Sequence, residues 1–467
     1  MNNKFEEFKN NIKGKKIAVL GLGVSNIPAI EYLNKLGTII YAHDQKFELT
    51  KKHESIKKLD NVKFYLGDMW LKDLDKVDYI LRSPGVKPFL PEIESAVKKG
   101  VKLSSEIELF MEYAPCKVIG ITGSAGKTTT TTLVTEILKK SGYKVWTGGN
   151  IGTPLFTKLD EIEQEDVVVL ELSSFQLMTM KKSPNISVVT NIYEDHLDYH
   201  RSFEEYVDAK TNIFLHQKED DICVINNDSD YKNRFENIIK ENNLKTKLVY
   251  FSENKLNNVS GAYIEQGIIK YIENENVEEI IHTDELMLRG NKNYLNVCTA
   301  ICVVKSLVSN DIIKETLKDF KGVEHRSEYV TKKEDVEYYN DSISTTPGKA
   351  MAALTAFDKK IILIAGGYDK NLDYTDLGKY IINASKIVIL LGNTTEKIYN
   401  SIINDKSYNK DEIQIIKVEN LEEAVKVANN NANNGDIVVM SPASASFDMF
   451  SSYKERGKVF KELVEKL

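Results

Sequence analysis

The segment that most constrains the fold is residues 117–128, which read KVIGITGSAGKT. An apolar run that leads through a glycine-rich turn into Lys-Thr is typical of a strand, a phosphate-binding loop and a helix. The common loop, G-x-x-x-x-G-K-[ST], would require glycine at position 121, which is Ile here, so GSAGKT is a shorter loop. Lys127 would reach the β- and γ-phosphates of a nucleotide, and Thr128 would offer its hydroxyl to Mg²⁺.

Apolar runs that read as strands recur along the chain and are followed by small or polar turns. The expected strands lie within 15–26, 38–44 and 77–86, then 117–128, 166–172 and 186–192, and finally 336–342, 360–367, 386–393 and 436–446. Helical segments alternate with these strands, including one expected over 288–307, and this pattern predicts parallel sheets. The length suggests three domains, and ligands of such sheets bind at the carboxyl ends of the strands.

Composition narrows the function classes. The net charge is −7, which argues against a nucleic-acid partner. The spacing of the four cysteines matches no zinc or disulfide framework and favours core thiols in a reducing compartment. The start, MNNKFEEFKNN, is too polar for a signal peptide, and no apolar run approaches the roughly 18 residues of a membrane span. We expect a cytoplasmic protein with no membrane span.

Two further polar residues follow expected strands of the central region. Glu171 ends the run VVVLE and suits a Mg²⁺ ligand, although a purely structural role stays open for a lone acid. His196 lies in NIYEDHLDYH, four residues before His200, a spacing that could suggest zinc. No HExxH motif and no matching cysteine accompanies them, so the zinc interpretation is set aside.

Lys210 is the most unusual residue of this region. SFEE at 202–205 predicts a capping box that starts a helix. One face of that helix and its continuation would carry Phe203, Tyr206, Val207, Lys210, Ile213 and Phe214. An ammonium in an apolar stripe must extend to solvent, pair with an acid or be chemically modified. Taken alone the first outcome is favoured, whereas a lowered pKa would make the amine reactive toward CO₂.

The first region carries a second glycine-rich turn, GLGVSN, after its first strand. Gly21 and Gly23 fit a dinucleotide-binding fingerprint, and Asp44 lies at about the distance of its ribose-binding acid. Asn26 stands where the third glycine would be, so NAD binding is an open alternative rather than the favoured one. The same backbone geometry would serve a uridine diphosphate.

GSAGKTT, LELSSFQL, NIYEDHLDYH, the helix with Lys210, and GVEHRSE together resemble the motifs of the Mur ligase family over the whole chain. That resemblance implies an ATP-dependent enzyme that adds an amino acid to a UDP-muramoyl precursor through an acyl phosphate, and the family uses the short loop GxxGK[ST]. LELSSFQL and SPASASFDMFSSYKERGKVF (441–460) are similar to the branch that adds D-glutamate to UDP-MurNAc-L-Ala. A DNPR-type motif of the diaminopimelate- and lysine-adding branches is not found.

The resemblance also implies an α/β fold of three domains. These are a Rossmann-like UDP-binding domain (1–106), a P-loop-type ATP-binding domain with a mainly parallel sheet (107–322) and a Rossmann-like acceptor-binding domain (323–467). The residues implied at ATP are Gly123, Ser124, Ala125, Gly126, Lys127, Thr128, Thr129, Asn293, Asn296, Arg326 and Asp341, with His325 beside them. Those implied at Mg²⁺ are Thr128, Glu171, His196 and Lys210 as a carbamate, and those implied in catalysis are Lys127, His196 and Lys210.

Two further sets follow from the same resemblance. The UDP-linked substrate would contact Gly23, Val24, Ser25, Asp44, Ser83, Pro84, Gly85, Asn150, Ser173 and Gln176. The acceptor amino acid would contact Thr345, Lys370, Ser446, Phe447 and Tyr453. The partners would be these small molecules alone, and we expect a monomer.

One position departs from the family pattern. The family commonly reads NDSKAT, whereas residues 340–345 read NDSIST, so Ile343 replaces a lysine. This leaves a different acceptor amino acid as the main alternative within the ligase class. Outside that class, the rivals are an NAD-dependent oxidoreductase and a non-catalytic module that only binds a nucleotide.

Overall fold

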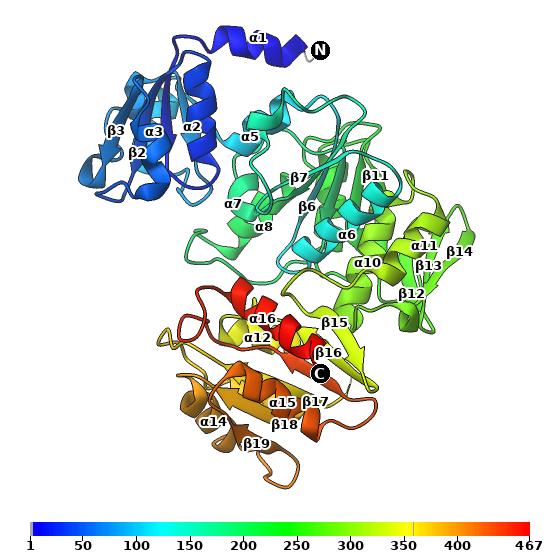
Figure 1. Ribbon diagram of the computed structural model, residues 1–467. Coiled ribbons are helices and arrows are strands. Elements are labelled where there is room, and N and C mark those ends of the chain that lie inside the picture. The colour runs from blue at the N-terminus through cyan, green and yellow to red at the C-terminus, as the bar shows by residue number, and fades with distance from the viewer. Residues whose placement is uncertain (1–2, 358) are drawn as a thin grey trace. The chain divides into compact units, whose positions relative to one another are not determined.

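The computed structural model describes residues 3–357 and 359–467, so the first two residues of the predicted N-terminal domain lie outside it. Three mainly parallel sheets with helices packed on them (Figure 1) confirm the predicted α/β class. The chain forms two compact units: one runs to residue 265 and includes 270–280 and 298–313, and the other holds 266–269, 281–297 and 314–467. The three predicted domain boundaries stay predictions.

The first sheet has the order β3-β2-β1-β4-β5 and is parallel throughout. Its strands are β1 (Lys16–Leu20), β2 (Ile39–Asp44), β3 (Val62–Leu66), β4 (Tyr79–Arg82) and β5 (Lys102–Ser104). The helices of this region are α1 (Asn3–Asn11), α2 (Asn26–Lys35), α3 (Glu54–Lys57), α4 (Pro91–Lys98) and α5 (Glu106–Tyr113). Alternate residues of β1 enter different cores: Ile17 and Val19 pack on one face of the sheet, and Ala18 and Leu20 on the other.

The second sheet has the order β14-β13-β12-β11-β10-β9-β6-β8-β7. Its strands are β6 (Lys117–Thr122), β7 (Val145–Gly149), β8 (Val167–Glu171), β9 (Ile186–Val189), β10 (Ile222–Asn226), β11 (Lys247–Ser252), β12 (Gly261–Glu265), β13 (Ile268–Glu273) and β14 (Asn276–His282). Its region also contains α6 (Lys127–Lys140), α7 (Ser174–Leu177), α8 (Phe203–Thr211), α9 (Lys232–Glu241), α10 (Asn291–Val304) and α11 (Asn310–Asp319). Because β6 lies between β8 and β9, the phosphate loop that follows β6 is flanked by the ends of two other strands.

The third sheet has the order β15-β16-β20-β17-β18-β19, with β15 as an antiparallel edge strand. Its strands are β15 (Glu328–Lys333), β16 (Val336–Asn340), β17 (Ile361–Gly366), β18 (Ser385–Leu391), β19 (Gln414–Lys417) and β20 (Ile437–Met440). Its helices are α12 (Pro347–Leu354), α13 (Leu377–Ala384), α14 (Thr395–Ile403), α15 (Leu421–Asn431) and α16 (Tyr453–Glu465). Two apolar clusters fill opposite faces of this sheet, and α16 packs against β15 and β16 (Figure 1).

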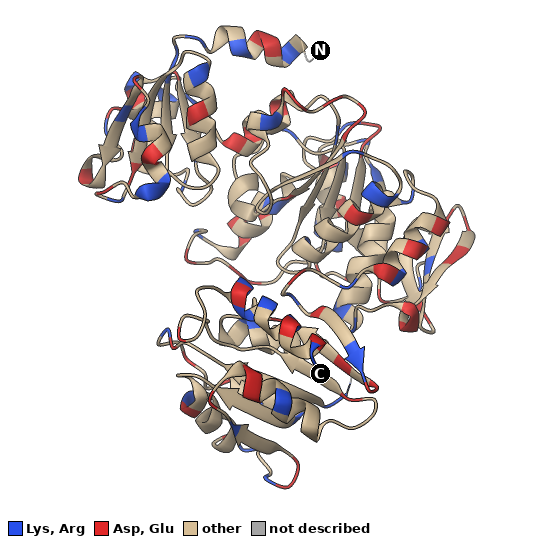
Figure 2. Cartoon of the chain, viewed as in Figure 1, with Lys and Arg blue, Asp and Glu red and all other residues tan. Residues whose placement is uncertain are grey.

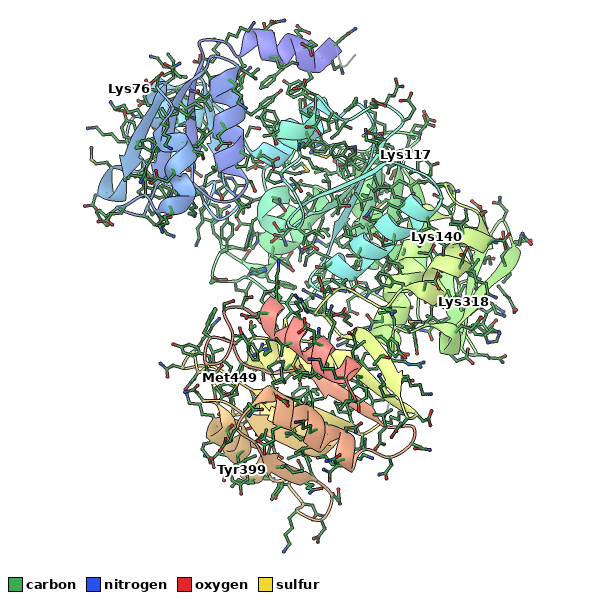
Figure 3. The ribbon with its side chains drawn as sticks, viewed as in Figure 1. Lys76, Lys117, Lys140, Lys318, Tyr399 and Met449 are labelled. Carbon is green, nitrogen blue, oxygen red and sulfur yellow. The ribbon has the colours of Figure 1, made fainter. Side chains whose placement is uncertain are left out.

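Charged residues of both signs occur around all three sheets (Figure 2). Acidic and basic residues are interspersed along the chain, and Figure 3 draws the side chains that the ribbon of Figure 1 leaves out. Cys223, Cys298 and Cys302 are buried and Cys116 is partly buried, and none is in a disulfide. Over the described residues, no helix has both the length and the apolar character needed to cross a membrane.

Candidate active site

Glycine conformations shape the phosphate loop between β6 and α6. Gly123 has a φ of +146° and Gly126 a φ of +82°, values that residues with a Cβ rarely adopt. A Cβ on Gly123 would lie 1.8 Å from Thr190 Oγ1, so a larger residue does not fit. The backbone at positions 123 and 126 therefore favours glycine, which accounts for the GxxG spacing of the loop.

The loop is braced by two residues at the end of β9, Thr190 and Asn191. The Thr190 hydroxyl donates to the carbonyl of Ala125 at 2.7 Å. The Asn191 side chain accepts from the Ala125 N–H at 2.8 Å, and the Asn191 carbonyl accepts from the Ser124 N–H at 2.9 Å. Two N–H groups that were expected to face a phosphate are thus bonded to Asn191 in this structure. The sequence analysis did not single out these braces, although they follow an expected strand.

The two polar residues after the loop take different partners. Lys127 Nζ donates to the carbonyls of Gly123 and Ser124 at 2.8 and 3.0 Å, so its ammonium lies over the loop itself. Thr128 Oγ1 donates to Glu171 Oε2 at 2.7 Å, which joins the start of α6 to the end of β8. The hydroxyl and the carboxylate predicted for Mg²⁺ are therefore adjacent.

Asn150 completes this group from the other side of Glu171. Its side-chain amide donates to Glu171 Oε1 at 2.7 Å, so both carboxylate oxygens are hydrogen-bonded. Glu171 is 2% exposed. Asn150 was predicted to contact the UDP-linked substrate, and in this structure it orients the candidate metal ligand.

Lys210 lies on α8 and is 2% exposed, so the expectation that it extends to solvent was wrong. Its Nζ donates to the Gly123 carbonyl at 3.0 Å and to Thr122 Oγ1 at 3.3 Å, and it lies 4.6 Å from the centre of the Tyr206 ring. Burial, with the charge of Lys127 adding to it, lowers the Lys210 pKa well below its ordinary value. The side chain is directed at the Gly123 carbonyl and the Thr122 hydroxyl instead of at water.

The predicted capping box at the start of α8 is only half formed. Ser202 Oγ accepts from the Glu205 N–H at 3.1 Å, as expected for the cap. The Glu205 carboxylate turns to Arg201, accepting from its N–H at 2.8 Å and pairing with its guanidinium. The reciprocal bond to the Ser202 N–H was predicted wrongly, because the neighbouring arginine supplies a charged partner.

The two histidines of NIYEDHLDYH occupy different environments. His196 has a φ of +55° and a side chain that is 48% exposed, with Nε2 3.4 Å from Asp195. Its ring lies 4.8 Å from that of Phe175. His200 is buried, with Nε2 2.9 Å from Ser174 Oγ, and burial lowers its pKa. The left-handed backbone of His196 is uncommon for a residue other than glycine, and such strained conformations cluster at functional sites.

The predicted UDP-binding turns of the N-terminal domain lie together. They follow β1 and β4, which are neighbours, and a Cβ on Gly21 would lie 2.9 Å from Ser83 Cβ. Asp44 Oδ2 accepts from the Leu22 N–H at 2.8 Å and so fixes the first turn. Asn26, which replaces the third glycine, donates to the carbonyls of Leu20 and Gly21 at 3.2 and 2.9 Å. Its amide closes the turn and explains why a side chain is accommodated there.

The remaining residues of this predicted surface differ in accessibility. Val24 is 81% exposed, and a Cβ on Gly23 or Gly85 would meet no atom of the described part of the chain within 4 Å. Ser173 and Gln176 form a capping box at α7, in which the side-chain oxygen of Gln176, Oε1, accepts from the Ser173 N–H at 3.0 Å. These two side chains satisfy each other in this structure.

The second unit carries the other residues implied at ATP. Asp341 follows β16, is 2% exposed, and accepts from the Ser441 hydroxyl at 2.7 Å and the Ser327 N–H at 3.1 Å. Burial raises its pKa to about 6, and the charge of Arg326 opposes that rise. His325, with a φ of +64°, is buried beside this group. On α10, the Asn296 amide donates to Asn293 Oδ1 at 3.3 Å.

Residues predicted for the acceptor come from loops after neighbouring strands of the third sheet. Lys370 follows β17 and places Nζ 5.7 Å from the ring centre of Phe447, which follows β20. The Phe447 ring is 59% exposed and also contacts Tyr368, while Ser446 beside it is buried. Tyr453 is the first residue of α16. The structure thus brings a cation and an exposed ring together at the carboxyl ends of two neighbouring strands.

Lys349, which the sequence analysis missed, lies in the first turn of α12. Its pKa is lowered by partial burial and by the charges of Arg326 and Lys370, whereas Asp341 opposes the shift. Ile343, at the departure from the family pattern, donates its N–H to the His325 carbonyl at 3.0 Å. Lys349 is therefore a basic residue close enough to interact with Asp341, two positions before the Ile343 that replaces a lysine.

Arg456 on α16 was also missed and braces the loops of this unit. It is 3% exposed and its Nη1 donates to the carbonyls of Ser444 and Ala445 at 3.1 and 3.0 Å. Its Nη2 donates to the Ser342 carbonyl at 2.9 Å. Burial lowers its pKa to about 10. The brace joins the loops that follow β16 and β20.

The fold and this site define a phosphate-loop enzyme built from α/β domains. Family models match residues 15–105 (Mur ligase MurD-like, N-terminal domain), 121–304 (Mur ligase middle domain) and 325–444 (Mur ligase, glutamate ligase domain). The chain belongs to the Mur ligase family, which confirms the resemblance seen in its motifs.

Curated relatives place the chain within that family. It is 44% identical, over 100% of both chains, to proteins named UDP-N-acetylmuramoylalanine--D-glutamate ligase from Clostridium botulinum (strain Loch Maree / Type A3) and from Acetivibrio thermocellus. Among solved structures, the UDP-N-acetylmuramate-alanine ligase MurC of Thermotoga maritima shares 19% identity over 97% of this chain and 99% of its own, with a TM-score of 0.55. The MurF ligase of Thermotoga maritima in complex with ADP shares 18% identity over 98% and 97%, with a TM-score of 0.52. These structural likenesses concern the fold.

Proposed function

We propose that this protein is an ATP-dependent ligase that joins D-glutamate to UDP-N-acetylmuramoyl-L-alanine during the cytoplasmic synthesis of peptidoglycan precursors. The observation that carries the proposal is the gathering of Thr128, Glu171 and Lys210 around a short phosphate loop. Relatives 44% identical over their full length bear the name of such a ligase. An NAD-dependent oxidoreductase would give the phosphate loop no role, and a module that only binds a nucleotide would give none to the buried amine of Lys210.

The reaction would consist of two transfers. An oxygen of the alanyl carboxylate attacks the γ-phosphorus of ATP; the new O–P bond forms as the bond to the β-phosphate oxygen breaks, which yields an acyl phosphate and ADP. The amine of D-glutamate then attacks the carbonyl carbon, the C–N bond forms, and phosphate leaves from a tetrahedral intermediate as the amine loses a proton. Lys127 would offset the charge on the transferred phosphoryl group.

The residues at the loop fit a magnesium ion. Mg²⁺ prefers oxygen ligands and is commonly held by one or two carboxylates together with substrate phosphates. Glu171 and Thr128 supply a carboxylate and a hydroxyl 2.7 Å apart, and when bound the ion would neutralise phosphate charge. His196 would position the substrate on the exposed side of the site; we do not assign it as a base.

Lys210 would join this ligand set as a carbamate. Its lowered pKa favours the uncharged, nucleophilic form of the amine, which would form a C–N bond to CO₂ and release a proton to solvent. The product is an anion, and the charge of Glu171 acts on the same buried nitrogen. A buried lysine directed at an anion-binding loop is thereby converted into an acidic ligand.

The acceptor would bind at the carboxyl ends of the strands of the third sheet. D-Glutamate carries two carboxylates, and the charge of Lys370, on the loop after β17, acts on Lys349 of α12. Lys349 would supply the charge that Ile343 does not, which supports D-glutamate over a different acceptor. Thr345, Ser446 and Tyr453 would provide hydroxyl groups around the same ligand.

The test is phosphate release from ATP and Mg²⁺ in the presence of UDP-MurNAc-L-Ala and one amino acid at a time. The panel contains D-glutamate, L-glutamate, L-lysine, meso-diaminopimelate and no addition. We expect release with D-glutamate only, and loss of release in Lys127→Ala. Release with another acceptor would move the specificity, and near-normal rates in Lys127→Ala would refute the assignment of the phosphate loop.

A further inference from the structure

A buried arginine of the N-terminal domain has no role in the chemistry above. Arg82 ends β4, immediately before the predicted UDP-binding turn, and is 0% exposed. Burial lowers its pKa, and the charge of Glu108 only partly opposes this effect. Among the described residues, Arg82 has no carboxylate within ion-pair distance, and its Nε has no hydrogen-bond partner. Burying a cation without an ion pair is costly, so its other contacts must compensate.

Those contacts divide between two segments that are far apart in sequence. On its own side, Arg82 Nη1 donates to the carbonyls of Val86 and Pro84 at 2.8 and 3.1 Å. On the side of the second sheet, Nη2 donates to the Phe175 carbonyl in α7 at 2.8 Å and to Thr179 Oγ1 at 3.3 Å. One planar guanidinium therefore connects the turn at 83–86 with α7.

Tyr199 reinforces the same junction. Its hydroxyl lies 2.8 Å from the Pro84 carbonyl and 3.0 Å from that of Val86, and it accepts from Arg82 Nη1 at 3.2 Å. The centre of the Tyr199 ring lies 4.0 Å from that of Phe175, with the two rings tilted by 36°, and Phe175 also contacts His196. The turn is thus joined to the segment that carries the candidate substrate-positioning histidine.

We propose that Arg82 is a positioning residue that holds the 83–86 turn in register with α7 and with the 196–200 segment. This inference rests on the proposed function. If the turn binds the uridine diphosphate, the guanidinium sets where the far end of that substrate, its carboxylate, lies relative to the phosphate loop. An error of about 1 Å in such a placement can cost about 100-fold in rate.

A purely structural role predicts a different outcome, and the chain offers a matched control. Asp160 also joins the N-terminal helices to the second sheet's region, accepting from Lys9 Nζ at 2.8 Å and from the Tyr32 hydroxyl at 2.6 Å. Asp160 belongs to no predicted substrate-binding set. If Arg82 only docks one domain on another, Asp160→Asn and Arg82→Met should have similar effects on turnover.

The experiment compares the full-length wild type with Arg82→Met, Arg82→Lys, Tyr199→Phe and Asp160→Asn. Each is assayed for KM of all three substrates, for kcat, and for thermal unfolding. UDP alone is titrated calorimetrically to measure the nucleotide site independently of turnover. We expect Arg82→Met to raise the KM for UDP-MurNAc-L-Ala and to lower kcat by about 10-fold each, with the KM for ATP within about twofold of wild type.

The other variants refine the result. Arg82→Lys keeps a charge but cannot span both sides, so we expect a loss between those of wild type and Arg82→Met. Tyr199→Phe keeps the ring and should lose about two- to fivefold in kcat/KM for the UDP-linked substrate alone, a cost of about one hydrogen bond. Asp160→Asn should lower the unfolding temperature without changing the ratio of the three KM values.

The outcomes separate this inference from the proposed function. A wild type that binds UDP but releases no phosphate with any acceptor would overturn the function. An active wild type whose Arg82 variants keep all kinetic constants, or lose affinity for the three substrates equally, would overturn the role of Arg82. If Arg82→Met does not fold, unchanged constants in both Arg82→Lys and Tyr199→Phe would overturn it as well.

Discussion

Replacing Lys210 tests the site most directly, because the structure predicts opposite effects on turnover and on stability. If its nitrogen carries a carbamate that holds the metal ion, Lys210→Met removes one charged ligand at the transferring phosphate. Loss of one preorganised stabilising group typically costs about 100- to 1,000-fold in rate, or about 3–4 kcal/mol. We therefore expect kcat to fall by at least about 100-fold.

The same substitution, Lys210→Met, should increase the stability of the fold. Lys210 is buried, its pKa is lowered by that burial, and its Nζ donates to a carbonyl and a hydroxyl, with no carboxylate of the described residues within hydrogen-bond distance. Methionine has a similar volume and needs no compensating hydrogen bonds when buried, whether the amine it replaces is charged or neutral, and replacing buried ionic groups by well-packed apolar groups commonly gains about 1–4 kcal/mol. We expect Lys210→Met to raise the free energy of unfolding in urea by about 1–2 kcal/mol, a gain reduced by the lost bonds of Nζ.

Lys210→Ala provides the matched comparison, because it leaves a cavity where methionine fills it. Formate or acetate should restore part of the activity of Lys210→Ala and none of that of Lys210→Met. In the wild type, removing CO₂ should lower the rate and bicarbonate should restore it. Normal turnover in Lys210→Met would refute the reasoning, and equal rescue of both variants would show that the acid acts elsewhere.

Two other substitutions test electrostatic features away from the phosphate loop. Burial raises the pKa of Glu106, which accepts from the Phe156 N–H at 2.8 Å, from its ordinary value of 4.5 to about 7. The contribution of Glu106 to the free energy of unfolding is therefore complete below pH 4.5 and lost as the pH rises through 7. In urea unfolding, the stability of Glu106→Gln relative to wild type should increase by about 3 kcal/mol between pH 4.5 and pH 8. A stability difference that does not vary with pH would contradict this prediction. Lys349→Ala should raise the KM for D-glutamate about 10-fold, the cost of one charge-assisted hydrogen bond, and leave the KM for ATP unchanged. The control Lys458→Ala, at an exposed position, should change neither KM. An unchanged KM for D-glutamate in Lys349→Ala would exclude Lys349 from the acceptor site.

The sequence predicted those parts of the fold and site that local physics determines. The phosphate loop could be recognised because positive φ at Gly123 and Gly126 excludes other residues from a contiguous stretch. The strands could be placed because parallel strands buried on both faces are continuous apolar runs. Lys210 could be placed on a buried face because its helix repeats every 3.6 residues.

Features that depend on distant contacts were not predictable in the same way. Arg82 reaches partners 93 and 117 positions away, and no local pattern marks such pairs. Taken alone, the apolar stripe predicted the direction of Lys210 wrongly, because the oxygen atoms that its amine contacts belong to residues 122 and 123, at the end of another strand. Only the fold shows that those atoms are nearer than water.

Two of the missed residues, Arg82 and Arg456, solve the same physical problem. Each is buried and holds a loop at the carboxyl end of a strand by donating to its carbonyl oxygens. A carboxylate brace would accept from the loop's N–H groups, which are the groups that bind phosphates and carboxylates, and would add a charge that repels those ligands. A guanidinium only donates, so it consumes none of those N–H groups and leaves the loop electropositive. Of these two kinds of brace, a buried arginine therefore reduces the affinity of an anion-binding loop for its ligand less than a carboxylate does.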